Sequence, residues 1–210
     1  IDDLSNYLAT INPEKKEFTE EDYTKLEKAT QMFEELDVTK ARSLGLGKVL
    51  DTVSTQLQTL LTAANAQKLI ERLSVKLATA DSKDLLETIA KQFTELEQDM
   101  VEGFPVLAEK LQAGMTTATF KKTEAELIED AENYKKKIDF YKKKVETEQD
   151  ESLREYFTNQ LLGYYTNLEN TYTKLMELNG EDYGKEIKAI REEADKYKPK
   201  TKLSNEEQLR

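Results

Sequence analysis

The 210-residue sequence contains no cysteine, no histidine and no tryptophan. Without cysteine, the chain can form no disulfide bond, no thiolate nucleophile and no cysteine-based zinc site. Without histidine, it lacks the usual general acid or base near neutral pH, and also the Glu-x-x-His ligands of a di-iron bundle. No calcium-loop spacing occurs, and no catalytic pair of carboxylates stands out among the 42 acidic residues. We therefore predict that the protein is not an enzyme and uses no cofactor or metal.

Glycine and proline are also scarce, with seven and three residues in the whole chain. These residues form most tight turns, so an all-β fold would have too few of them. Lysine, glutamate, leucine and alanine, which favour helices, are abundant. The composition therefore predicts an all-α fold, and the length of the chain suits one large helical domain or two small ones.

The charge balance is acidic, with a net charge of −11. An acidic surface repels phosphate groups, which argues against nucleic acid as a partner. No apolar run is long enough to span a bilayer, so we expect no transmembrane segment, while peripheral contact with a membrane stays open. The chain begins with isoleucine rather than methionine, which we interpret as a processed product or an excised segment. The absence of cysteine is compatible with export, and we expect an exported or cell-surface protein.

The most regular pattern lies in residues 121–179, where apolar residues recur at alternating spacings of four and three. This spacing places them on one face of a helix, and most residues between them are charged or polar. A polar break at 149–152 separates two arms, and Asp150 or Ser152 is suited to cap the second arm, which Gly180 ends. We predict an antiparallel helical hairpin. The first arm carries Leu127, Ala131, Tyr134, Ile138, Tyr141 and Val145, and the second carries Phe157, Leu161, Tyr164, Leu168, Leu175 and Leu178.

Neither arm can bury its apolar face alone, so a third helix is needed to cover the hairpin. The helix predicted over residues 183–197 is the natural partner. We therefore expect an elongated multi-helix bundle. It would consist of an N-terminal part with several shorter helices (1–119), a long three-helix part (120–198) and a polar tail (199–210), with one continuous domain as the alternative.

The N-terminal part contains weaker signals. Asn12-Pro13 is expected to end a first short helix, and Thr19 to cap the second. A later apolar stripe changes sides near Ala63–Gln67, so we predict a break there, with one long helix that packs on two faces as the alternative. Gly114 is expected to end another short helix, and residues 115–119 to connect it to the hairpin.

Two consecutive heptads of the first arm carry the only basic patch of this acidic sequence. The segment Tyr134–Ile138 recurs seven residues later as Tyr141–Val145, and each segment holds three consecutive lysines. Such a patch suits contact with anionic lipid headgroups, polysaccharide or an acidic protein. The alternative is a solvated helix face whose lysine stems cover the edge of the core and whose charge is neutralised by acids on adjacent helices. The candidate partner-binding lysines are Lys135, Lys136, Lys137, Lys142, Lys143 and Lys144.

Tyrosines are concentrated in the same region, with eight of the ten between Tyr134 and Tyr197. Where two aromatic residues are adjacent, one stripe cannot cover both, so we expect Tyr156 and Tyr165 to be exposed and include them in the candidate site. Exposed aromatic rings suit the recognition of proteins or sugars. Ordinary use in the core and at its rim is the alternative.

These observations favour a non-enzymatic helical-bundle binding or surface-display module that engages a protein or polysaccharide partner; they do not predict its oligomeric state. Two alternatives stay open. The uncharged segments Thr52–Gln67 and Leu111–Phe120 are similar in composition to the membrane-entering segments of α-helical pore-forming toxins. The other alternative is an intracellular scaffold whose helices recruit peptides.

Overall fold

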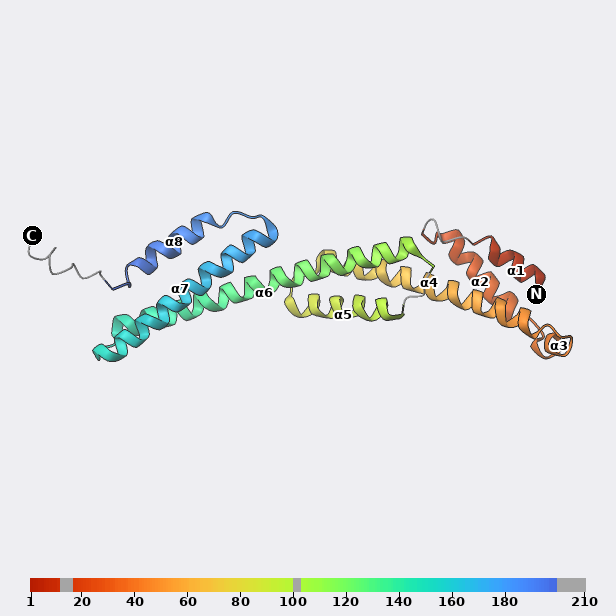
Figure 1. The fold of residues 1–210 in the computed structure, drawn as a ribbon, viewed down its shortest axis with the longest axis horizontal. Coiled ribbons are helices and arrows are strands. Elements are labelled where there is room, and N and C mark those ends of the chain that lie inside the picture. The colour runs from red at the N-terminus through yellow and green to blue at the C-terminus, as the bar shows by residue number, and fades with distance from the viewer. Residues whose placement is uncertain (12–16, 100–102, 200–210) are drawn as a thin grey trace, which may run out of the picture. The chain divides into compact units, whose positions relative to one another are not determined.

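A computed structural model describes residues 1–11, 17–99 and 103–199. Within these ranges the chain forms eight α-helices and no β-strand (Figure 1). The all-α fold predicted from the sequence is therefore confirmed. No helix in the described ranges combines the length and the apolar character needed to cross a membrane. The helix end predicted at Asn12-Pro13 lies outside the described residues, as does all but the first residue of the predicted tail.

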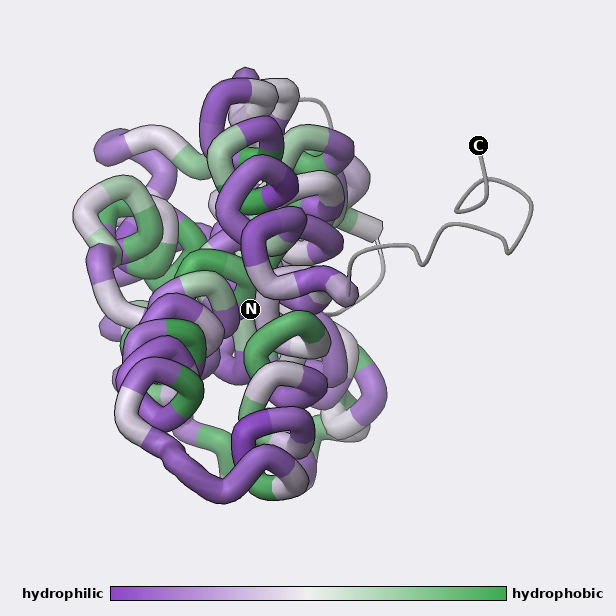
Figure 2. Tube along the Cα trace, turned by 90° about the vertical axis from the view of Figure 1, so that its left-hand side faces the viewer, coloured by the Kyte–Doolittle hydropathy of each residue, from purple (hydrophilic) through white to green (hydrophobic). Residues whose placement is uncertain are grey.

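The chain divides into two compact units, Ile1–Thr119 and Phe120–Arg210. Along each helix, hydrophobic and hydrophilic residues alternate, which Figure 2 shows as green and purple segments of the same tube. This alternation is typical of helices that bury one face. The helices are α1 (Asp2–Ala9), α2 (Glu20–Glu34), α3 (Val38–Ser43), α4 (Gly47–Thr79), α5 (Lys83–Asp99), α6 (Pro105–Thr147), α7 (Glu151–Asn179) and α8 (Gly184–Asp195).

The start of α2 is fixed by side chains on both sides of the helix end. The Thr19 hydroxyl accepts a hydrogen bond from the Asp22 backbone N–H (3.2 Å), and the Asp22 carboxylate accepts one from the Thr19 N–H (2.8 Å). The rings of Phe18 and Tyr23 stack with their centroids 6.1 Å apart. The two hydrogen bonds form a capping box, which satisfies two backbone donors at the helix end, and the stacked rings form a hydrophobic staple. The cap predicted at Thr19 is therefore confirmed.

A buried glutamine on α4 holds the segment that precedes α2. Gln67 is only 2% exposed. Its Nε2 donates a hydrogen bond to the Phe18 carbonyl (2.8 Å), and its Oε1 accepts one from the Phe18 N–H (2.8 Å). Because Phe18 is itself buried, this one side chain satisfies both backbone groups in place of water.

The break predicted at Ala63–Gln67 is wrong, because α4 runs without interruption from Gly47 to Thr79. The apolar stripe does change sides, and the helix is buried on both sides where the two stripes overlap. The buried residues of this overlap are Ala63, Ala64, Ala66 and Gln67. Small alanines let neighbouring elements approach the helix on two sides, and alanine is also the strongest helix former, so the chain has no local reason to turn here.

The helix end predicted at Gly114 and the connector predicted at 115–119 are also wrong, because α6 continues through both. A Cβ atom at Gly114 would lie 2.7 Å from two ring atoms of Phe93, a fully buried residue of α5. Glycine at this position therefore permits the close approach of the Phe93 ring and does not end the helix.

The helical hairpin predicted over residues 121–179 is confirmed in the second unit, where α6 and α7 lie side by side (Figure 1). Ring contacts show that the two helices are antiparallel. Tyr134 lies against Tyr164, and Tyr141 lies against Phe157, each with ring centroids 6.1 Å apart. As the residue number increases along α6, the number of the contacting residue on α7 therefore decreases.

Both ends of α7 use residues that the sequence indicated. Asp150 caps the helix by accepting a hydrogen bond from the Leu153 N–H (3.1 Å). Gly180 follows the last helical residue with φ of 72°, the left-handed conformation that glycine adopts without steric cost. These two residues set the length of the second arm at 29 residues.

The predicted third helix is α8, which packs against the hairpin. Two stacked tyrosine pairs join it to α7: Tyr172 with Tyr183 (5.1 Å) and Tyr165 with Tyr197 (6.3 Å). Rising positions on α7 meet falling positions on α8, so α8 is antiparallel to α7 and parallel to α6. The shared core consists of Ala131, Ile138, Leu161, Tyr165, Leu168, Tyr172, Leu175, Ile187, Ile190 and Ala194.

Candidate binding surfaces of the three-helix unit

The six candidate lysines of α6 fall into two sets with different surroundings. In the first set, Lys142 forms an ion pair with Glu193 of α8. Their hydrogen bond raises the pKa of Lys142 and lowers the pKa of Glu193. Lys135 pairs with Glu132 of its own helix (3.3 Å), and its Nζ lies 5.7 Å from the centroid of the Tyr172 ring. These two lysines therefore contact groups of the bundle itself.

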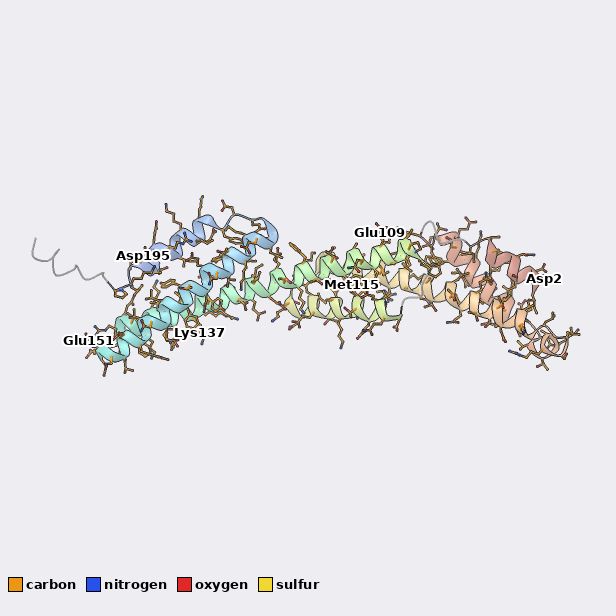
Figure 3. The ribbon with its side chains drawn as sticks, in the orientation of Figure 1. Asp2, Glu109, Met115, Lys137, Glu151 and Asp195 are labelled. Atoms are coloured by element: carbon orange, nitrogen blue, oxygen red, sulfur yellow. The ribbon has the colours of Figure 1, made fainter. Side chains whose placement is uncertain are left out.

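The other four lysines surround an exposed phenylalanine. Phe140 is 51% exposed, and the Nζ of Lys144 lies 5.5 Å from its ring centroid. Residues three and four positions away lie on the same face of a helix. By this rule the surface contains Lys136, Lys137, Phe140, Lys143 and Lys144, all of them exposed. We call these five residues the Phe140–lysine surface, and Figure 3 labels Lys137 as its marker on α6.

None of the four lysines of the Phe140–lysine surface forms an ion pair with any residue that the structure describes. The alternative interpretation of the basic patch is that acids on adjacent helices neutralise its lysines. Among the described residues, this holds for only one of the six lysines, Lys142, which pairs with Glu193. The pair Lys136 and Lys137 is one heptad from Lys143 and Lys144, about 10 Å along the axis. Two pairs of hydrated ammonium groups thus flank one apolar ring.

A row of aromatic rings leads from this surface across the hairpin. The Phe140 ring meets the Tyr141 ring edge to face, with centroids 5.1 Å apart. Tyr141 and Phe157 lie 6.1 Å apart, and Phe157 and Tyr156 lie 5.7 Å apart. The structure places Tyr156 at the surface, where it is 54% exposed. The row therefore joins two exposed rings through two half-buried ones.

Tyr165 is buried, and the exposure expected for it is wrong. Only 2% of its surface is exposed. Its neighbour Tyr164 faces α6, where it stacks on Tyr141 (5.6 Å), while Tyr165 faces α8, where it stacks on Tyr197 (6.3 Å). Because α7 has partner helices on two sides, both members of an adjacent pair can be covered.

A pocket of about 320 Å³ lies among the three helices of this unit. Its floor is apolar, and its rim carries charges of both signs. Three of the predicted site residues, Lys135, Lys142 and Tyr165, line it; Tyr156 and the other four lysines do not. The lining consists of Lys135, Ile138, Asp139 and Lys142 from α6, Tyr165, Leu168 and Tyr172 from α7, and Glu186, Ala189, Ile190 and Glu193 from α8.

The hydroxyl of Tyr165 is a buried polar group of this lining. It lies near the Glu193 carboxylate but forms no hydrogen bond of good geometry with any described residue. Burial raises the pKa of Tyr165, and the negative charge of Glu193 raises it further, so the phenol stays protonated and able to donate. A buried group without a hydrogen bond costs about 1–3 kcal/mol. A ligand that accepts this hydrogen bond would recover part of that free energy.

The first unit contains a separate pocket of about 490 Å³ between α2 and α4. The Tyr23 hydroxyl is buried there and has no hydrogen bond to a described residue. The Nζ of Lys68 lies 4.4 Å from the centroid of the Tyr23 ring. Burial, followed by the charge of Glu71, raises the pKa of Tyr23 to about 12. None of the candidate partner-binding residues predicted from the sequence lines this pocket.

In the ranges that the structure describes, no group of acidic side chains is arranged to hold a metal ion. Comparison of the chain with protein-family models, with curated proteins and with solved structures finds no match. The function is therefore inferred from the surfaces of the chain itself.

Proposed function

We propose that this chain is a non-enzymatic binding module that engages an acidic protein partner through the Phe140–lysine surface. One observation carries the proposal. Four exposed lysines, none of which forms an ion pair within the described residues, surround a phenylalanine that is 51% exposed. An aromatic residue at the centre with polar groups around it is the arrangement of an interface core and its rim.

The distribution of charge supports an anionic partner. The chain as a whole carries a net charge of −11, so most of its surface repels anions, while the Phe140–lysine surface attracts them. Unpaired ammonium groups at an interface rim steer an acidic partner and set its orientation. Each exposed pair contributes only about 0.2–1 kcal/mol, so four such pairs together still need a further source of affinity.

Phe140 is that further source, and it favours a protein over a simple polyanion. Aromatic residues at the centre of an interface, ringed by polar groups, supply much of the binding free energy. Burying the exposed half of this ring contributes about 1–2 kcal/mol. A polyanion that binds through charge alone would use the lysines and leave the ring uncovered.

The test compares two variants with the same change in net charge. In the first, Lys136, Lys137, Lys143 and Lys144 are all replaced by glutamate. In the control, four exposed lysines outside the surface are replaced in the same way: Lys91, Lys174, Lys185 and Lys188. The probe is a fluorescent peptide of alternating glutamate and leucine, with binding measured by fluorescence anisotropy. We expect the first variant to lose binding and the control to retain it.

The Phe140→Ala variant separates a protein partner from a polysaccharide. It keeps every charge, so its affinity for dextran sulfate should equal that of the unmodified chain, while its affinity for the peptide should fall about tenfold. Equal loss of peptide binding in both charge variants would show a net-charge effect and contradict the proposal. Binding of dextran sulfate with no binding of the peptide would assign the surface to polysaccharide instead.

A further inference from the structure

The pocket of the three-helix unit is built from residues that repeat every seven positions on each helix. Each of the three helices contributes two lining residues that are seven positions apart. The pocket therefore has two similar layers, each with one of these residues from every helix. Lys142, Tyr165 and Glu193 form one layer, and Lys135, Tyr172 and Glu186 form the other. Because α6 and α8 are parallel, the glutamate of each layer stands opposite the lysine of the same layer.

The two layers differ in one contact. In the first, Lys142 and Glu193 form an ion pair that closes the gap between α6 and α8. In the second, Lys135 pairs instead with Glu132 of its own helix (3.3 Å). Glu186 forms no ion pair within the described residues. We call these the closed layer and the open layer.

The open layer leaves complementary groups unmet. Asp139, between the two lysines of α6, also forms no ion pair among the described residues, although its charge acts on Lys142, so two carboxylates of the lining lack a direct salt bridge. Lys135 is held by an exposed pair within its own helix and by its contact with Tyr172, and an exposed pair contributes little free energy. The Tyr165 hydroxyl is a buried donor that lies near the Glu193 carboxylate and forms no hydrogen bond of good geometry with a described residue. Ligand pockets typically combine a few such convergent polar groups with an apolar floor.

We propose that this pocket binds a small zwitterion with an apolar body, the chemistry of a free apolar α-amino acid. The ammonium group pairs with Glu186 and Asp139, and the carboxylate pairs with Lys135 and accepts from the Tyr165 hydroxyl. The apolar body covers the floor formed by Ile138, Leu168 and Ile190. A volume of about 320 Å³ is at the small end of ligand pockets and suits a molecule of this size.

Both signs of charge are required by the lining. A ligand with an ammonium group alone would leave Lys135 and Tyr165 without an acceptor and would be repelled by Lys135. A ligand with a carboxylate alone would lie beside Glu186 and Asp139 without compensation. A zwitterion satisfies both ends and restores, through the ligand, the bridge between α6 and α8 that the closed layer makes directly. The site is separate from the Phe140–lysine surface, so the two proposals can fail independently.

The experiment titrates the full chain with three probes of similar shape: L-phenylalanine, phenethylamine, which has only the ammonium group, and 3-phenylpropanoate, which has only the carboxylate. Binding is followed by calorimetry and by amide NMR shifts of α6 and α8. We expect saturable binding of L-phenylalanine, with each single-charge analogue weaker by about tenfold or more, the factor expected for loss of one charged contact.

Variants identify the contacts. Glu186→Gln and Lys135→Gln should each weaken L-phenylalanine binding about tenfold. The matched controls Glu192→Gln and Lys188→Gln change exposed residues of α8 outside the lining, and should leave the affinity unchanged. Tyr165→Phe keeps the buried ring, so it folds, and should also weaken binding.

Three results would overturn the proposal. The first is the absence of saturable binding of L-phenylalanine to the unmodified chain. The second is binding of phenethylamine or 3-phenylpropanoate as tight as that of L-phenylalanine, which would assign the pocket to a cation or an anion. The third is equal affinity in the Glu186→Gln variant and its Glu192→Gln control.

Discussion

Replacement of Gln67 by leucine tests how the first unit is held together. The Gln67 amide forms two hydrogen bonds of 2.8 Å with the backbone of Phe18, the residue before the α2 cap. Leucine has a similar size and is suited to a buried position. The change therefore removes the hydrogen bonds without opening a large cavity, and it leaves the N–H and C=O groups of Phe18 buried and unpaired.

The expected loss follows from these two groups. Each buried backbone group that loses its partner costs about 1–3 kcal/mol, or about 2–6 kcal/mol for both. Burial of leucine in place of an amide offsets about 1–2 kcal/mol of this. We therefore expect the Gln67→Leu variant to lower the free energy of unfolding of the first unit by about 2–3 kcal/mol, the middle of a range of about 0–5 kcal/mol and a large share of the stability of a typical domain.

The measurement is urea denaturation, together with hydrogen exchange of the Phe18 amide, which reports on the first unit alone. The Phe18 amide should exchange faster in the Gln67→Leu variant. Gln58→Leu is the matched control, because Gln58 is exposed on the same helix; it should change stability by less than about 0.5 kcal/mol. If the two variants proved equally stable and protected the Phe18 amide equally well, the role assigned to Gln67 would be wrong.

Three further predictions concern other contacts. Gly114→Ala places a Cβ 2.7 Å from ring atoms of the buried Phe93, so overpacking should outweigh the gain in helix propensity and lower the thermal midpoint, with a net cost of about 1–2 kcal/mol. The hydrogen bond from Lys142 lowers the pKa of Glu193, so this pair should stabilise the fold above the ordinary carboxylate pKa of 4.5, and the stabilisation should disappear as the pH falls below it. Glu193→Gln should therefore flatten the acid limb of the stability–pH curve by less than about 1 kcal/mol. Tyr165→Phe removes a buried hydroxyl that has no hydrogen bond of good geometry, so the thermal midpoint should stay equal or rise, whereas a fall would show that the contact of this hydroxyl with Glu193 stabilises the fold.

The parts of the fold that could be predicted are those with a local signal. The hairpin followed from one unbroken spacing rule, a cap at Asp150 and a glycine at position 180. The cap of α2 at Thr19 followed from a side chain that can accept from the next turn of backbone. Each of these features depends on residues close in the sequence, so periodicity and capping chemistry are sufficient to locate them.

The errors arose where a distant element decides the meaning of a residue. Gly114 is a helix breaker by propensity, yet Phe93 of another helix explains it. The stripe shift at 63–67 looks like a turn until both sides of α4 are seen to be covered. The exposure expected for Tyr165 follows from its place beside Tyr164, outside the apolar stripe, but α8 covers that second side of α7. In all three cases the sequence specifies the side chain but not the neighbour.

The candidate site was predictable only in part. The lysine heptads draw attention to α6, but the sequence does not show which of the six lysines pair with an acid. Phe140, the centre of the exposed surface, was missed because it does not belong to the apolar stripe of α6. Its signal is visible afterwards: a large apolar residue at the positions three and four away from four lysines. Glu186 and Glu193 repeat at the same seven-residue spacing as Lys135 and Lys142, and that shared period could have indicated the pocket.

The central claim is that the Phe140–lysine surface receives an acidic protein. The most direct measurement is the change in the amide NMR spectrum as the glutamate–leucine peptide is added to the full chain. We predict that the largest shifts lie at Phe140 and the four surrounding lysines, and that they vanish in high salt or in the fourfold glutamate variant. Shifts centred on the first unit, or no shifts at any residue, would contradict the claim.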